Sequence, residues 1–227
     1  MATNTTTTEQ NVGEILSRSE RFIEKYQKQI IIGISAVILL VVVIMGVRHA
    51  YILPKSQEAE NAIFKGENYF AQGQWDLALN GDSIDYIGFE EIISQYGFTK
   101  TANLAKAYAG VCYYRIGDFE SALKYLKKFS ADDRLISPAI TGLVGDCYVD
   151  MGNVKEGIKW FNKAADKADD SLLSPIFLKK AGLAYESEQE YKKAFDVYMK
   201  IKNKYPSSQE GSMIDKYIDR VEALFDK

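Results

Sequence analysis

The side chains that most often carry catalytic or metal chemistry are scarce in this chain. His49 is the single histidine among 227 residues, and it lies at the boundary of the apolar run of residues 30–47. This position argues against Ser-His-Asp and Cys-His arrangements, and one histidine cannot form a multi-histidine metal site. Two pairs of adjacent aspartates could act as acid and base, but their loop positions favour turn and helix-cap roles: Asp132, Asp133, Asp169 and Asp170. No glycine-rich phosphate loop follows a strand pattern. We therefore predict no catalytic residue, no metal site and no cofactor, and we do not expect an enzyme.

The two cysteines are the remaining reactive groups. Cys112 and Cys147 each lie two residues after a glycine, in segments of similar sequence, so we place them at equivalent positions of neighbouring helices. Such helices pack about 8–10 Å apart, whereas a disulfide usually needs Cα atoms within ~7 Å. We predict two free, buried thiols. A disulfide remains the alternative, because an exported domain meets an oxidising compartment.

One segment near the N-terminus is apolar over its whole circumference. Residues 30–47 read IIIGISAVILLVVVIMGV, with no charge and with Ser35 as the one polar side chain. As a helix this run covers roughly 27 Å, close to the ~30 Å hydrocarbon core of a bilayer. A signal peptide has a shorter apolar run and a small-x-small cleavage site, and a buried helix of a soluble domain normally has a polar stripe. We predict an uncleaved transmembrane signal-anchor helix over residues 30–53, in contact with membrane lipid.

The flanks of this segment predict its orientation. Residues 1–11 are polar and threonine-rich, and we expect them to be disordered. Residues 12–29 have the spacing of an amphipathic helix that lies under the membrane, or equally of a helix that continues the span outward. Basic residues are more numerous before the span than after it, where Arg48 and Lys55 lie: Arg18, Arg21, Lys25 and Lys28. This bias favours a cytoplasmic N-terminus and an exported C-terminal domain, as for a single-pass bacterial inner-membrane protein with a periplasmic domain.

The exported domain, residues 54–227, has the composition of an all-α protein. Ala, Leu, Lys, Glu and Tyr recur at helical spacing, and no convincing strand alternation is present. Residues 56–227 carry 22 basic and 27 acidic side chains, a difference of −5, with both signs scattered. Nucleic acid as a partner would favour a basic face, so we exclude it.

Three segments of this domain repeat a pattern. They begin at Tyr108, Leu143 and Lys180 and read YAGVCYYRIGDFESALKYL, LVGDCYVDMGNVKEGIKWF and KAGLAYESEQEYKKAFDVY. Small residues on paired helices permit close approach, and the large residues fill the space to the neighbouring pair. In order, the repeated positions are Gly110, Gly145 and Gly182; Tyr113, Tyr148 and Tyr185; Phe119, Val154 and Tyr191; Ala122, Gly157 and Ala194; and Leu126, Phe161 and Tyr198.

Further features extend the pattern on both sides. KGENYFAQGQWDLAL repeats it nearer the span, and a turn signal at residues 80–83 predicts a loop that interrupts this unit's second helix. Gly117 and Gly152 suit the turns between paired helices. A final apolar stripe predicts a helix that covers the last repeat: Ile214, Tyr217, Ile218, Val221, Leu224 and Phe225.

Over residues 58–206 this pattern resembles the tetratricopeptide repeat (TPR), a helix–turn–helix unit of 34 residues. This sequence shares with the TPR pattern the small-x-x-Tyr spacing, the turn, the aromatic residue, the alanine and a terminal proline, Pro206. It departs from the pattern because the small–Trp start is absent and Gly157 replaces the usual alanine. The resemblance implies an all-α solenoid of about four helix pairs with a C-terminal capping helix.

The first helices of such an array line its concave side. Residues there that are not used for packing could bind an extended peptide or a partner helix, unless they are ordinary packing residues and the final helix fills the groove. From the spacing we predict this protein-binding groove to contain Tyr108, Val111, Tyr114, Arg115, Leu143, Asp146, Val149, Asp150, Lys179 and Leu183.

The order of parts resembles the YfgM-like ancillary subunits of the SecYEG translocon, membrane-anchored periplasmic TPR proteins, here of a Bacteroidetes type. The motifs YILPKSQEAENAIFKGENYF and YIGFEEIISQYG carry this resemblance. It implies an adaptor that contacts the translocon, a periplasmic prolyl isomerase chaperone and exported polypeptides, and that helps to hand exported chains to chaperones. The alternative is a TPR scaffold for another cell-envelope assembly, such as a secretion, cell-wall or outer-membrane biogenesis complex.

Overall fold

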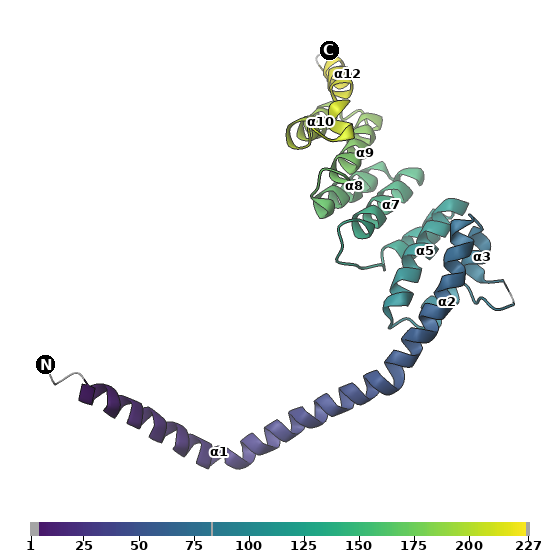
Figure 1. Ribbon diagram of the computed structural model, residues 1–227. Coiled ribbons are helices and arrows are strands. Elements are labelled where there is room, and N and C mark those ends of the chain that lie inside the picture. Colours follow the sequence, from purple (N-terminus) through teal and green to yellow (C-terminus); the bar gives the residue numbers. More distant parts are fainter. Residues whose placement is uncertain (1–4, 83, 226–227) are drawn as a thin grey trace. The chain divides into compact units, whose positions relative to one another are not determined.

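The computed structural model describes the backbone of residues 5–82 and 84–225, and the side chains of residues 25–82 and 84–224 (Figure 1). Contacts divide the chain into two compact units, Met1–Pro54 and Lys55–Lys227. Every described element is helical. The all-α fold predicted from the sequence is confirmed.

The first unit consists of helix α1 (Thr5–Val47) and the π-helical turn η1 (Arg48–Ile52). The side chains of residues 30–47 are exposed, by 54% for Ile31 and 65% for Met45. Among the described residues one helix is long and apolar enough to cross a membrane, and this segment is its apolar part. The disordered start that we predicted falls partly on residues 1–4, which lie outside the described residues, while residues 5–11 already belong to α1.

The second unit is a series of helix pairs. Helix α2 (Leu53–Ala71) precedes the short helices α3 (Trp75–Asn80) and α4 (Phe89–Gln95). The pairs α5 (Lys100–Ile116) with α6 (Phe119–Leu126), α7 (Ile136–Asp150) with α8 (Val154–Ala168), and α9 (Ser174–Ser187) with α10 (Tyr191–Lys204) follow. The turn-like α11 (Gln209–Ser212) and α12 (Asp215–Phe225) end the chain. This confirms the predicted solenoid of about four pairs with a final helix.

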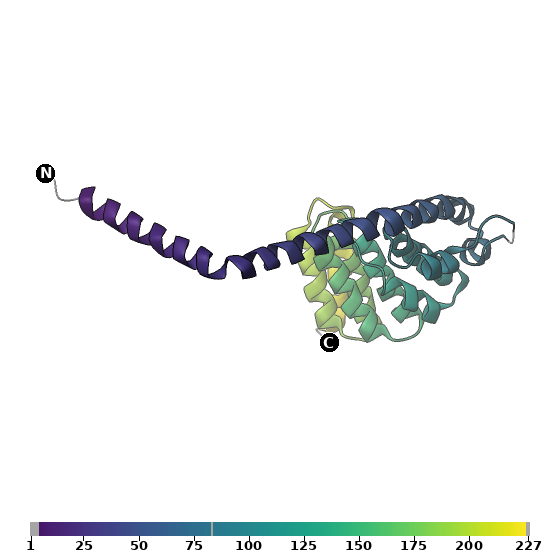
Figure 2. The same ribbon diagram turned by 90° about the horizontal axis from the view of Figure 1, so that it is seen from below.

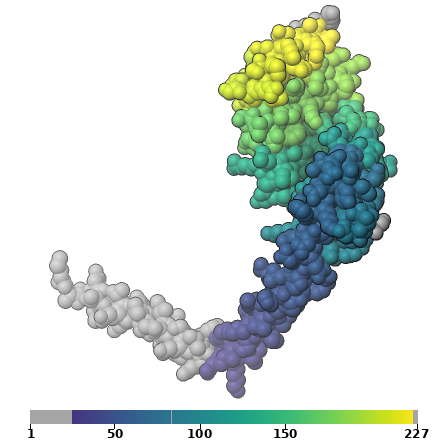
Figure 3. All heavy atoms as spheres, turned by 45° about the vertical axis from the view of Figure 1, so that its right-hand side comes forward, coloured from purple at the N-terminus to yellow at the C-terminus, as the bar shows by residue number. Residues whose placement is uncertain are grey.

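Each pair contacts mainly the pairs next to it in the sequence. In the space-filling view the colours of this unit follow one another in sequence order from α5 to α12 (Figure 3). Seen from below, α7, α8, α9 and α10 lie side by side (Figure 2). Helix α12 packs on α10 and buries Ile214, Ile218 and Val221, so it covers the apolar end of the last repeat, as predicted.

The first repeat contains the predicted interruption, and a single carboxylate organises it. Oδ1 of Asp82 accepts the backbone N–H groups of Ile84, Asp85 and Tyr86, each at 3.0 Å. Its Oδ2 accepts the hydroxyl of Tyr69 at 2.8 Å. These hydrogen bonds hold the pKa of Asp82 well below its usual range. Asp82 therefore ties residues 84–86 of the loop between α3 and α4 to Tyr69 of α2.

A left-handed residue joins the two helices of each repeat. Gly73, Gly117 and Gly152 have φ angles of 71°, 86° and 79°, which glycine adopts at little cost. The last repeat places Gln189 in this conformation, with a φ angle of 60°. The two turn glycines that we predicted are confirmed, and the strained glutamine was not foreseen.

The glycines inside the first helices permit close helix contact, although the residue opposite differs from our expectation. We expected small residues on both helices. Instead a Cβ added at Gly110 would lie 2.4 Å from Cδ2 of Leu126, and one at Gly182 would lie 2.2 Å from Cε1 of Tyr198. Each glycine thus makes room for the large residue that closes the second helix. Only in the α7–α8 pair do two glycines, Gly145 and Gly157, also face each other.

This geometry predicts the effect of a methyl group at Gly182. Tyr198 is fully buried and its hydroxyl is held by Glu186 at 2.5 Å, so the ring cannot move aside. We expect Gly182→Ala to lower the free energy of unfolding of the repeat unit by about 1–3 kcal/mol, measured by urea denaturation of the full-length chain in detergent. Gly46→Ala is the matched control, because an added Cβ there has no atom within 4 Å. Equal stability of the Gly182→Ala variant and the parent would contradict this packing.

The left-handed conformation of Gln189 predicts that a substitution there raises the free energy of unfolding, in contrast to Gly182→Ala. Replacing Gln189 by glycine removes a left-handed strain of about 1–2 kcal/mol and adds a smaller entropy to the unfolded chain. We expect Gln189→Gly to raise the free energy of unfolding by about 0.5–1 kcal/mol in the same assay. Glu188→Gly is the control, because φ at Glu188 is already −86° and the same substitution there should destabilise. A loss of stability in Gln189→Gly would show that the turn is not strained.

Candidate functional site

The ten residues predicted to line a groove lie on the three first helices α5, α7 and α9. The first four belong to α5, the next four to α7, and Lys179 and Leu183 to α9. Their assignment to a protein-binding groove stays a prediction, but their contacts separate them into packing, paired and exposed residues.

Four of the ten are packing residues. The ring of Tyr108 stacks on Phe89 with centroids 5.1 Å apart, and its hydroxyl donates to Glu67 at 3.1 Å. Val111 and Leu143 pack against the core between α6 and α7, and Val149 packs against the core of the following pair. These side chains hold neighbouring repeats together, which was the alternative left open by the sequence.

Two others, Asp146 and Tyr114, form polar contacts with side chains of the first helices. Lys180 lies 2.7 Å from Oδ2 of Asp146, so an ion pair joins α9 to α7. Burial raises the pKa of Asp146 above its ordinary value despite this lysine. Burial, together with a hydrogen bond to Asp150, raises the pKa of Tyr114 to about 12. The spacing did not identify Lys180, because it lies one position away from the predicted groove register.

The side chains of Arg115, Asp150 and Leu183 are exposed, the last by 41%. One from each first helix, they offer a cation, an anion and an apolar group to a partner. Such a mixture suits the rim of a protein interface more than a small-molecule site.

Helix α12 contacts a predicted groove residue of α9, while two such residues of the earlier repeats stay exposed. Nζ of Lys179 lies 5.6 Å from the ring centroid of Tyr217 on α12, and Arg220 pairs with Glu186 on α9 at 2.7 Å. Helix α12 therefore contacts the groove register of α9, where Lys179 lies. Arg115 and Asp150, on the earlier repeats, stay exposed.

The aspartate pairs cap helices, as predicted. Oδ1 of Asp133 accepts the N–H groups of Leu135 and Ile136 before α7, and Oδ1 of Asp170 accepts that of Leu173 before α9 at 2.7 Å. Among the described residues no three of the His, Cys, Asp and Glu side chains gather as a metal site would need.

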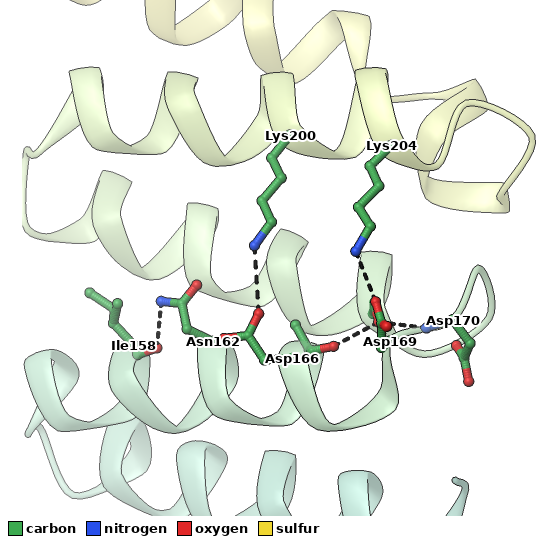
Figure 4. Close-up of polar contacts among 9 residues, drawn as sticks. Ile158, Asn162, Asp166, Asp169, Asp170, Lys200 and Lys204 are labelled. Atoms are coloured by element: carbon green, nitrogen blue, oxygen red, sulfur yellow. Dashed lines mark hydrogen bonds and ion pairs between the residues drawn. The ribbon is translucent and has the colours of Figure 1, made fainter. Parts of the chain in front are cut away.

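A ladder of ion pairs links the second helices α8 and α10. Lys200 lies 3.6 Å from Asp166, and Lys204 lies 2.8 Å from Asp169, so two lysines of one helix meet two aspartates of the preceding one (Figure 4). Exposed pairs of this kind each contribute little to stability, but they define which faces of the two helices meet.

Comparisons with known proteins agree with this architecture. The tetratricopeptide repeat model matches residues 108–133 and 179–208. Two solved structures of the nearly identical TPR-like repeats of a Podosopora anserina protein, described as a kinesin light chain, superpose with a TM-score of 0.54 at 11% identity. They cover 73% of this chain and 85% and 86% of theirs. The second unit has a TPR-like fold.

A TPR repeat-containing protein of Methanocaldococcus jannaschii is 30% identical over 109 residues. The match covers 48% of this chain and 18% of that relative, so the chain spans less than a fifth of the relative's length. Repeats of this kind present extended surfaces for protein–protein interaction, and the fold is typical of non-catalytic scaffolds.

The cysteines give a testable consequence of this packing. Cys112 and Cys147 are free and fully buried, as predicted, and burial raises the pKa of each thiol to about 12. We expect neither to react with iodoacetamide at pH 8 in the native chain and both to react in urea, measured by mass spectrometry. Ser212→Cys supplies an exposed control that should react in both states. Alkylation of native Cys112 or Cys147 as fast as the control would contradict this burial.

Proposed function

We propose that this chain is a membrane-tethered, non-catalytic adaptor that binds proteins at the exit of the Sec translocon and helps to hand exported polypeptides to periplasmic chaperones. The N-terminal helix anchors it in the bacterial inner membrane, with the N-terminus in the cytoplasm. The repeat unit lies in the periplasm, where a prolyl isomerase chaperone is a partner.

The observation that carries this proposal is the combination of two parts in one chain. A helix with exposed apolar side chains precedes a helical repeat unit whose first helices present exposed, chemically mixed side chains. Tethering raises the local concentration of a binding surface around clients that emerge from the same membrane, so each contact can be weak. The mixture of Arg115, Asp150 and Leu183 suits many different polypeptides better than one matched ligand.

The second candidate is a scaffold for another envelope assembly, such as a secretion, cell-wall or outer-membrane biogenesis complex. The Lys180–Asp146 ion pair and the packing of Val111, Leu143 and Val149 favour it, because they stiffen the first helices as a fixed docking platform requires. Its partners would stay bound in mild detergent, whereas clients in transit would dissociate.

A photo-cross-linking experiment separates these functions. A photoreactive amino acid at Leu183, in full-length protein in living cells, should capture translocon components or nascent exported chains, identified by mass spectrometry. Leu224 is the matched control, because it is 42% exposed, close to the 41% of Leu183, but lies on α12. We expect at least about a tenfold excess of these products at Leu183, as for a specific contact over a non-specific one.

Two outcomes would contradict the proposal. Products at Leu183 that belong to one stable envelope complex would favour the scaffold instead. Identical products from Leu183 and Leu224 would show that the first helices are not the binding surface.

A further inference from the structure

The repeat unit has a second surface of a different kind, on its second helices. A cleft of about 100 Å³ lies where α6, α7 and α8 meet. Leu126, Ile140 and Val144 form its apolar floor, Phe129 and Trp160 its walls, and three lysines its rim: Lys127, Lys163 and Lys167.

The cleft exists because α6 is short. At an interval of 35 residues Leu126 corresponds to Phe161, yet α6 ends at Leu126 whereas α8 continues to Ala168, about two turns further. The chain after α6 is tied to α5, where the side-chain amide of Asn103 bonds both backbone groups of Ser130, at 2.8 and 3.3 Å. The junction between α6 and α8 therefore lacks two helical turns, which in the later junction, between α8 and α10, are supplied by α8.

The lysines on the rim correspond to lysines that have partners one repeat later. At an interval of 37 residues, Lys163 and Lys167 correspond to Lys200 and Lys204, which pair with Asp166 and Asp169 of the preceding helix (Figure 4). Because α6 lacks those turns, neither Lys163 nor Lys167 forms a close ion pair with a described carboxylate, although Lys167 interacts electrostatically with Asp133 in the loop after α6. Lys163 instead lies 4.3 Å from the ring centroid of Trp160.

A hydroxyl that lines the cleft forms no hydrogen bond with a described residue at the same place. In the later junction the hydroxyl of Ser174 donates to the carbonyl oxygen of Ala165 on α8 at 2.7 Å. The corresponding Ser137 is 2% exposed and lines the cleft, and its hydroxyl forms no hydrogen bond within the described part of the chain. Ser130 occupies the position in the earlier repeat that Ala165 occupies in the later one. Its carbonyl oxygen already accepts a hydrogen bond from Asn103.

We propose that this cleft binds a short acidic helical segment of a partner protein, which takes the place of the two turns missing from α6. Two carboxylates three residues apart, as Asp166 and Asp169 are, meet Lys163 and Lys167. A helix carbonyl accepts the hydroxyl of Ser137, and an apolar side chain fills the floor. Small-molecule sites have volumes of about 300–1,000 Å³, so a cleft of about 100 Å³ fits one side chain of a peptide.

The test uses as its probe the C-terminal end of α8, the segment that fills the junction between α8 and α10. A synthetic peptide of residues 161–169, stapled into a helix through the positions of Lys163 and Lys167, carries the two aspartates and no tryptophan. It is added to the full-length chain in phosphatidylcholine nanodiscs, with Trp75→Phe so that Trp160 reports binding. We expect a saturable fluorescence change below millimolar peptide, and about tenfold weaker binding to Lys163→Gln/Lys167→Gln.

Matched controls separate specific binding of the peptide in the cleft from general charge attraction. Lys155→Gln/Lys159→Gln removes the same charge from the same helix away from the cleft and should change affinity by less than about twofold. A probe with asparagine in place of both aspartates should not bind. Absence of saturable binding, equal loss in the two lysine variants, or equal binding of the asparagine probe would each overturn the proposal. So would a response of Trp160 to phosphatidylglycerol nanodiscs that displaces the peptide, because the cleft would then serve a lipid surface.

Discussion

The structure depends first on eighteen consecutive residues whose side chains are exposed and almost entirely apolar. Residues 30–47 are exposed all round the helix, and burying a single side chain such as Ile31 or Met45 is worth about 1.5–3 kcal/mol. Water is therefore a poor surrounding for this helix, whereas a hydrocarbon layer satisfies both its side chains and its internally bonded backbone. The proposed location, the tethering of the repeat unit and the low affinity that tethering permits all follow from this constraint.

Within the repeat unit, the features with a local cause could be predicted from the sequence. Gly117 and Gly152 supply left-handed turns, and the turn signal before α4 interrupts the first repeat. The expectation that small residues face small residues was wrong for most pairs, because the residue that closes the second helix fills the space above each glycine. Sequence spacing identifies the glycine but not the side chain opposite it.

The candidate surfaces were less predictable, because they depend on contacts between repeats. Spacing placed Val111 and Val149 on first helices, but the neighbouring helix decides whether such residues pack or stay exposed. The cleft beside Trp160 lies where α6 ends early, and Asn103 and Ser130, 27 positions apart, hold the chain that follows α6. No periodic signal could have located it, although the unmatched lysines become visible once the repeats are aligned with the structure.

The central claim is that the N-terminal helix crosses the membrane and holds the repeat unit on its outer side. Protease treatment of spheroplasts tests it most directly, with an epitope tag at the C-terminus and, in a second strain, at the N-terminus. We predict that protease removes the C-terminal tag from spheroplasts but not from intact cells, and that the N-terminal tag survives in both. A C-terminal tag that survives in spheroplasts and is lost only after lysis would contradict the account.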